Sequence, residues 1–212
     1  MEPGILRPEA IESRSMEIIE SELGGCDLAE PYRSVLKRVI HTSADFDYKE
    51  NLVWSEEAAE KAVRALEKGV TIVTDTNMAL AGINKPGLEK LGSRACCFMS
   101  DPEVAREAKE RGVTRAAVSM ERSAELGEDL IYAIGNAPTA LITLERLFRE
   151  GKISPLLVIA VPVGFVNVVE AKELIISSGM PYIAAKGRKG GSNIAAAICN
   201  ALIYSITRKK NK

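Results

Sequence analysis

Short apolar runs recur along the last two-thirds of the chain, and they restrict the fold more than any other feature of the sequence. They occupy residues 70–74, 94–99, 115–119, 131–134, 156–163 and 182–185. Between most of them lie stretches of helical character at residues 101–111, 138–150, 166–178 and 192–207. Because the apolar runs do not alternate with polar residues, they are typical of strands covered on both faces, as in a parallel sheet between helices. We therefore expect an α/β fold in three layers, α/β/α.

The first third of the chain is expected to be helical. Helices are predicted over residues 8–24, 31–41 and 55–68, because a Pro or a Ser-Glu-Glu sequence starts each stretch and glycine ends two of them. We interpret residues 1–212 as one domain, with 1–69 as an N-terminal helical arm and 70–212 as the α/β core.

Charge and hydropathy disfavour two classes of partner. The 28 Lys and Arg residues are balanced by 29 Asp and Glu residues, so the net charge of −1 does not favour a nucleic-acid partner. The longest apolar run, residues 156–166, contains a Pro and a Gly and is far shorter than the roughly 18 residues that suggest a membrane span. The first ten residues hold no apolar signal segment. We expect a cytoplasmic protein without a membrane partner.

The cysteines and the histidine limit the possible chemistry. Cys96 and Cys97 are adjacent, whereas Cys26 and Cys199 are isolated, so neither a metal-site spacing nor a disulfide framework is present in the sequence. We interpret all four as small buried side chains in a reducing compartment, and we expect no metal site. His41 is the one histidine of the chain, and it is the obvious acid–base group near neutral pH.

In a parallel sheet, ligands bind at the carboxyl ends of the strands, and the segments after the predicted strands are rich in small polar residues. The most informative segment precedes the last predicted helix and contains Lys186, Arg188, Lys189, Gly190, Gly191 and Ser192. Glycines allow a ligand to approach the backbone, and a helix N-terminus favours an anion. We expect a carboxylate or phosphate site here, and the alternative is a solvated basic turn with a glycine cap. Neither a Walker loop nor a dinucleotide fingerprint is present in the sequence.

Two interpretations also stay open for the other polar candidates. His41, with Thr42 and Ser43, is either part of a reactive segment or a structural histidine bonded to a carbonyl or to Asp45. Arg14 and Ser15 are either the solvated face of the first helix or ligand contacts.

Later in the chain the same ambiguity returns. Arg122 and Ser123, expected after the third strand, either clamp a carboxylate or belong to an ion pair with Glu121 or Glu125. Asp75 and Asn77 either bind a ligand or cap the next helix, and Met78 lies beside them as a candidate apolar contact. Glu170 and Lys172 are interpreted as an ordinary solvated face.

Four separated stretches resemble one known family. They are VIHTSADFDY (39–48), IGNAPTAL (134–141), VPVGFVNVVEAKE (161–173) and KGRKGGSNIAAAICNAL (186–202), and the likeness extends back to ILRPEAIESRSMEII (5–19). Together they resemble the signature stretches of precorrin-8X methylmutases, including the cobalt-precorrin-8 forms, over essentially the full length of the chain.

This resemblance implies an isomerase of cobalamin synthesis that moves a methyl group from C-11 to C-12 of ring C. It also implies a flavodoxin-like fold, a homodimer, a corrinoid substrate, no dissociable cofactor and handover to neighbouring enzymes of the pathway. The family's histidine corresponds to His41 and its substrate-contacting serine to Ser15. The arginine of a T-R-S stretch corresponds to Arg122, although Glu121 replaces the family's Thr in this chain.

Three other functions remain as alternatives at this point. A non-catalytic tetrapyrrole carrier or sensor would bind the macrocycle without converting it. A nucleotide- or flavin-binding module would use the glycine-rich segment without the usual phosphate motif. A receiver-type signalling domain would need an acidic cluster at the strand ends, where Asp75 stands alone.

Overall fold

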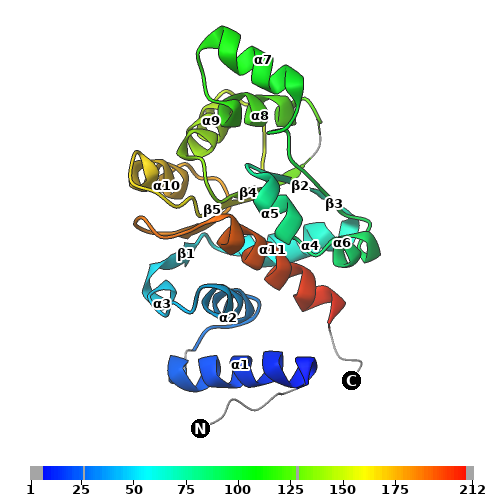
Figure 1. The fold of residues 1–212 in the computed structure, drawn as a ribbon, viewed down its shortest axis with the longest axis vertical. Coiled ribbons are helices and arrows are strands. Elements are labelled where there is room, and N and C mark those ends of the chain that lie inside the picture. The colour runs from blue at the N-terminus through cyan, green and yellow to red at the C-terminus, as the bar shows by residue number, and fades with distance from the viewer. Residues whose placement is uncertain (1–6, 26, 128, 209–212) are drawn as a thin grey trace.

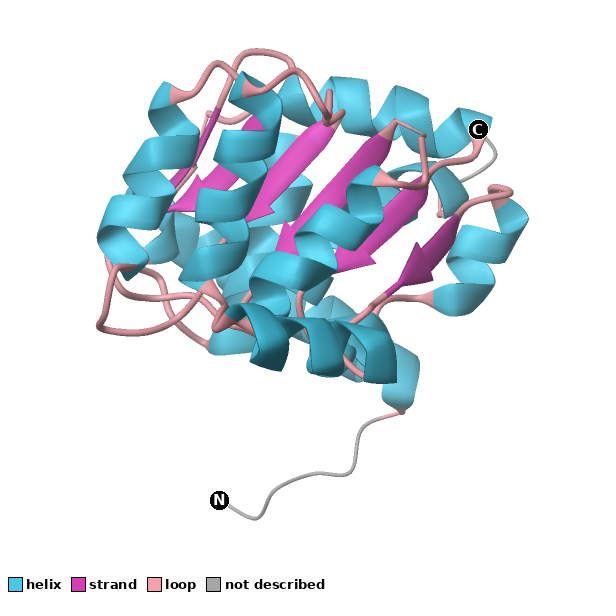
Figure 2. Ribbon diagram, turned by 90° about the horizontal axis from the view of Figure 1, so that it is seen from above, coloured by secondary structure: helices cyan, strands magenta, loops and turns pink. Residues whose placement is uncertain are grey.

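A computed structural model describes residues 7–25, 27–127 and 129–208 of the chain. Its centre is a twisted six-stranded sheet with helices packed on both faces (Figures 1 and 2). The strands are β1 (Leu52–Trp54), β2 (Thr71–Thr74), β3 (Arg94–Cys96), β4 (Leu130–Ile134), β5 (Leu157–Ala160) and β6 (Tyr182–Ala185). The longer helices are α1 (Pro8–Leu23), α2 (Tyr32–Ser43), α4 (Ala58–Lys68), α7 (Pro102–Arg111), α8 (Arg115–Ala124), α9 (Pro138–Arg149), α10 (Val168–Ser177) and α11 (Ser192–Thr207). Shorter helices are α3 (Tyr48–Asn51), α5 (Asn77–Gly82) and α6 (Lys85–Lys90).

The strand order is β1-β6-β5-β4-β2-β3, and every pair is parallel except β1 with β6. The five parallel strands follow the flavodoxin-like order, with the first strand placed between the second and the third. The order in which successive strands are added to the sheet therefore reverses between β2 and β4, and the carboxyl ends of these two parallel strands form the switch point where such folds bind ligands. This arrangement confirms the expected mainly parallel, flavodoxin-like sheet.

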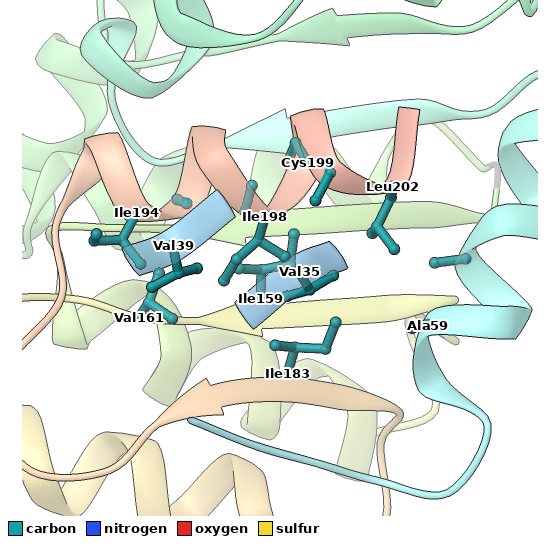
Figure 3. Close-up of a cluster of buried hydrophobic side chains, with 14 of the residues drawn as sticks. Val35, Val39, Ala59, Ile159, Val161, Ile183, Ile194, Ile198, Cys199 and Leu202 are labelled. Atoms are coloured by element: carbon teal, nitrogen blue, oxygen red, sulfur yellow. The ribbon is translucent and has the colours of Figure 1, made fainter. Parts of the chain in front are cut away.

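Two separate hydrophobic clusters confirm the three layers. On one face, α2, α4 and α11 pack against alternate residues of β4, β5 and β6. In Figure 3, Val35 and Val39 of α2 lie with Ile194 and Ile198 of α11 over Ile159 of β5. On the other face, α8, α9 and α10 cover the remaining strand residues, among them the fully buried Tyr132. Burial on both faces explains why the strand sequences are continuously apolar.

Local signals set several helix starts. The side chains of Thr76, Asn84, Asp101 and Thr114 each accept a hydrogen bond from a backbone N–H two or three residues later. Such N-caps satisfy amide groups that the helix itself leaves unpaired. The cap at Thr114 begins α8, so the segment 115–119 that we predicted as a strand is helical. Its Ala116, Met120 and Ser123 face inward at helical spacing, which a five-residue apolar run does not reveal.

The N-terminal third also differs from its prediction as a helical arm. β1 lies within it and pairs with β6 as an antiparallel edge strand. α2 is part of the helical layer, with Val35, Leu36 and Val39 almost fully buried. Only α1 lies outside that layer, at the bottom of Figure 1, where it packs on α2. Within the described residues, no helix has the length and hydropathy to cross a membrane.

Candidate functional site

Four strand-to-helix loops meet at the carboxyl end of the sheet. They are residues 75–76 after β2, 135–137 after β4, 161–167 after β5 and 186–191 after β6. The Thr76 and Ser192 hydroxyls lie 2.8 Å apart, which joins the first loop to the start of α11. A Cβ on Gly135 would lie 2.7 Å from the Gly191 carbonyl oxygen, so the second and fourth loops are in close contact. Residues distant in sequence therefore form one polar surface.

The loop of residues 186–191, which we call the glycine loop, is held rigidly against the loop after β5. The Gly191 N–H donates to the Val161 carbonyl at 2.9 Å, and the Gly164 N–H donates to the Arg188 carbonyl at 3.2 Å. Gly190 has φ of +159°, and a Cβ there would lie 2.1 Å from the Val161 oxygen. Only glycine fits at this position.

Lys172 of α10 supports the glycine loop from inside the protein. Its side chain is buried, and its Nζ donates to the Gly187 and Lys189 carbonyl oxygens, each at 2.8 Å. Burial lowers the pKa of Lys172 to about 8. The prediction that Lys172 belongs to a solvated face is therefore wrong, although Glu170 is exposed as expected. Lys172 lies one helical turn after the buried Val168, on the inner side of α10. The sequence gives no signal for its contacts, because both partners are backbone carbonyls.

An ion-pair cluster joins the glycine loop to the end of α2. Lys189 Nζ lies 2.6 Å from a carboxylate oxygen of Asp45 and 2.6 Å from one of Asp47. The Lys189 ammonium holds the pKa of Asp45 below its usual range, and the two carboxylates raise that of Lys189. The glycine loop therefore lies next to the segment that carries the histidine, which sequence spacing alone does not show.

His41 lies in the last turn of α2, and its side chain is exposed. α2 ends when Ala44 adopts a left-handed conformation with φ of 53°. The Ser43 hydroxyl donates to the Val39 carbonyl at 2.8 Å and accepts from the Asp45 N–H at 3.3 Å, whereas Thr42 is exposed. Among the described residues, no side chain or carbonyl hydrogen-bonds to the His41 ring. The alternative of a structural histidine bonded to Asp45 or a carbonyl is thus not what the structure contains.

Asp75 organises the switch point. It is completely buried, and its two carboxylate oxygens accept hydrogen bonds from the N–H groups of Gly135, Asn136 and Ala137 at 2.7–2.9 Å. Burial raises the pKa of Asp75, and the three N–H donors oppose that shift. Both oxygens are occupied by the backbone, so Asp75 ties β2 to the loop after β4 and has no exposed surface for a ligand in this conformation.

The rim of the polar surface carries unusually exposed apolar side chains. Phe165 is 82% exposed, Val166 77% and Met78 72%. The guanidinium of Arg188 lies 5.5 Å from the centre of the Phe165 ring. Lys186 and Arg188 are exposed, and no carboxylate among the described residues forms an ion pair with either. An exposed apolar rim beside unpaired cations suits a ligand with an apolar face and acidic edges.

The remaining candidates lie apart from the glycine loop in their contacts. Asn77 donates to the Ser100 hydroxyl at 2.6 Å. On α1, Arg14 pairs with Glu17, and the Ser15 hydroxyl donates to the Ile11 carbonyl. These interactions keep the three side chains in local networks.

Arg122 and Ser123 follow no strand, because both lie on α8. Arg122 pairs with Glu125 at 3.3 Å. Ser123 is fully buried, and its hydroxyl lies within hydrogen-bonding distance of the Met120 carbonyl and the Tyr132 hydroxyl. Glu121 forms ion pairs with Arg111 and Arg146 instead of with Arg122.

The structure describes three of the cysteines, and none of these three forms a disulfide with another. Cys199 is buried, which raises the pKa of its thiol to about 12. Cys96 and Cys97 are half-buried, so the prediction of full burial is wrong for them, and Cys26 lies outside the described residues. Within the described part of the chain, no three His, Cys, Asp or Glu side chains are grouped to hold a metal ion.

Comparison with known proteins gives a consistent result. The family model for precorrin-8X methylmutase matches residues 10–205. A cobalt-precorrin-8 methylmutase of Leptospira interrogans is 42% identical over 94% of both chains. A precorrin-8X methylmutase of Pseudomonas aeruginosa is 35% identical over 92% of this chain and 94% of its own. The crystal structure of a precorrin-8X methylmutase from Thermus thermophilus superposes with a TM-score of 0.86 and 38% identity, covering 92% of this chain and 94% of that one.

Proposed function

Since the chain belongs to the precorrin-8X methylmutase family, we propose that it moves a methyl group from C-11 to C-12 of ring C of precorrin-8X or its cobalt complex. It is an isomerase, and its reaction is the methyl migration of cobalamin biosynthesis. The bond from C-11 to the methyl carbon breaks and the bond from C-12 forms. Substrate and product have the same atoms, so the step consumes no co-reactant.

The proposed position of the site rests on one observation. Lys186 and Arg188, which form no ion pair with a described carboxylate, lie beside a rim of exposed apolar side chains. The substrate is a large flat macrocycle fringed with carboxylates. Lys186 and Arg188 are free to receive carboxylates, and Phe165, Val166 and Met78 offer apolar surface to the ring. The N-terminus of α11, which lacks a side-chain cap, adds a further donor for an anion.

The residues that we expect to contact the substrate differ in the roles that their contacts favour. Lys189 is already neutralised by Asp45 and Asp47, so its contribution is to hold the glycine loop beside α2. Gly190 and Gly191 let the backbone pass close to Val161, and Ser192 begins α11. Lys186 and Arg188 are left as the cations that bind the rim of the macrocycle.

His41 is the catalytic group of this proposal. It is exposed at the end of α2, next to the segment that Lys189 anchors, and no protein group occupies its ring nitrogens among the described residues. We propose that it donates a hydrogen bond or a proton to a ring C nitrogen and so favours the rearranged π system. Catalysis then combines tighter binding of the rearranging ring with one acid–base contact.

We also propose a cytoplasmic homodimer that passes its product to neighbouring enzymes of the pathway. This part of the proposal rests on the family to which the chain belongs. Light scattering on the purified protein should give twice the chain mass of 22.9 kDa, and a mass of one chain would contradict the dimer.

The direct test of the function is the absorption spectrum of the purified protein incubated with precorrin-8X, repeated with its cobalt complex. Methyl migration changes the conjugation of the ring, so we expect conversion to the hydrogenobyrinate or cobyrinate chromophore. The faster reaction identifies the preferred form. A bound but unconverted spectrum would instead indicate a carrier, and an unchanged free-substrate spectrum would refute binding at this surface.

A further inference from the structure

Lys172 is a buried cation with no carboxylate partner among the described residues. It is only 1% exposed, although lysine is rarely buried without a counter-ion. Its nitrogen donates to two carbonyl oxygens, those of Gly187 and Lys189, each at 2.8 Å. Burying a charge in this way costs free energy, since carbonyl dipoles replace hydration only in part. An apolar side chain would fill the same space at lower cost.

The two acceptors lie on either side of Arg188. Lys172 therefore holds the backbone before and after that residue, while the Gly164 N–H donates to the carbonyl of Arg188 itself at 3.2 Å. Gly187, with φ of +73°, turns the chain between β6 and this point. The result is a short turn fixed at three consecutive residues.

The fixed turn sets the direction of two side chains. The Arg188 guanidinium lies 5.5 Å from the centre of the Phe165 ring, and Lys189 reaches Asp45 and Asp47. Arg188 and Phe165 are exposed at the rim, whereas Lys172 lies underneath. If the backbone of Arg188 moved by about an ångström, its guanidinium would no longer lie at hydrogen-bonding distance from a substrate carboxylate.

We propose that Lys172 is a positioning residue of the methyl-transfer site, which fixes the turn 187–189 so that Arg188 binds a carboxylate of the macrocycle. This inference rests on the proposed function and deepens it. Lys172 does not touch the substrate, because the glycine loop lies between them. Its effect is therefore on substrate binding more than on the chemical step.

The test compares two variants of α10 in the full-length protein. Lys172→Met removes both hydrogen bonds to the glycine loop but keeps an unbranched apolar side chain. Ser178→Ala is the matched control: at the C-cap of α10, the Ser178 hydroxyl donates to the Ile175 carbonyl and accepts from the Met180 N–H. Both variants lose two hydrogen bonds, so an effect that follows from the loss of hydrogen bonds alone should appear in both.

We expect Lys172→Met to raise KM for the macrocycle by about tenfold or more while kcat changes by less than about threefold. Ser178→Ala should leave KM unchanged. An unchanged KM in Lys172→Met, or an equal rise in the two variants, would overturn the proposal. If Lys172→Met does not fold, Lys172→Gln, whose NH₂ group can still donate but sits on a shorter side chain, should show an intermediate rise in KM. An unchanged KM in that variant overturns the proposal.

Hydrogen exchange separates this inference from the proposed function, because it needs no substrate. The amides of Gly190 and Gly191 should exchange faster in Lys172→Met than in the wild type, with the amides of β5 unchanged. Unchanged exchange in the glycine loop would refute the positioning role even in an active enzyme. A wild type that fails to convert precorrin-8X would refute the function but leave this readout intact.

Discussion

Replacement of Asp75 by Asn tests whether the switch point depends on a carboxylate. Asp75 accepts from three N–H groups through two oxygens, and Asn offers only one oxygen. If that oxygen keeps the bonds from Asn136 and Ala137, the new NH₂ group faces the N–H of Gly135. Gly135 is buried, so its donor is left without an acceptor or water.

The expected loss follows from these contacts. One buried unsatisfied donor costs about 1–3 kcal/mol, and the two remaining bonds lose the strengthening of an ionised acceptor. Burial raises the pKa of Asp75, so the neutral amide also avoids the desolvation of a charge. We therefore expect a net destabilisation of about 2 kcal/mol, which for a chain of this size lowers Tm by about 4–8 °C.

Calorimetry or circular dichroism measures this shift, and Asp101→Asn is the control. Asp101 caps α7 with one bond to the Glu103 N–H, and Asn caps equally well. Its Tm should change by less than about 2 °C. An Asp75→Asn protein that melts within about 1 °C of the wild type, or no lower than the control, would show that the Asp75 carboxylate does not stabilise the contact between β2 and the loop after β4.

Three further predictions concern the glycine loop. Lys172 has a folded-state pKa of about 8, below the value near 10.4 of an unfolded lysine. Between these values the unfolded chain binds more protons, so Lys172 should add at most about 3 kcal/mol to stability as pH rises from 8 to 10.4. The rise in the free energy of unfolding should be smaller by this amount in Lys172→Met, and an unchanged pH dependence of urea unfolding in that variant would contradict the shift. Gly190→Ala should cost about 3 kcal/mol or more, because its Cβ meets the Val161 oxygen. The control Gly187→Ala meets no atom within 4 Å and should cost only the left-handed backbone term of about 1–2 kcal/mol, so equal losses in thermal unfolding would count against the close contact. Lys189→Met should raise the pKa of Asp45 toward its usual range, and an NMR titration without that rise would show that the ion pair does not form in solution.

The sequence predicted the elements that are buried on both sides. β6 and α11 have the expected bounds, because a continuous apolar run ended by Lys186 and a long apolar helix after Gly191 leave few alternatives. The prediction of a strand over residues 115–119 was wrong, because a run of five apolar residues does not distinguish a strand from a helix. Thr114, which caps α8, was the better signal. β1 was missed because a three-residue edge strand has no recognisable period.

The sequence predicted which loops lie together at the candidate site, but not the side-chain contacts that join them. Parallel strands bring their carboxyl ends together, so the glycine loop and Asp75 were correctly placed at one edge of the sheet. The contacts of Lys172 with two carbonyls, and of Lys189 with Asp45 and Asp47, span from 15 to 144 residues of sequence. Such contacts depend on how loops fold back, and residue type alone does not encode them.

We propose that His41 performs chemistry at the surface formed by the glycine loop. The measurement that tests it most directly is a single-turnover absorption experiment with His41→Ala and His41→Gln at protein concentrations above that of the macrocycle. Because Lys186 and Arg188 bind the substrate in this account, we predict that both variants still bind it, with conversion slowed by about 100-fold or more. Conversion at the wild-type rate in either variant would contradict the account.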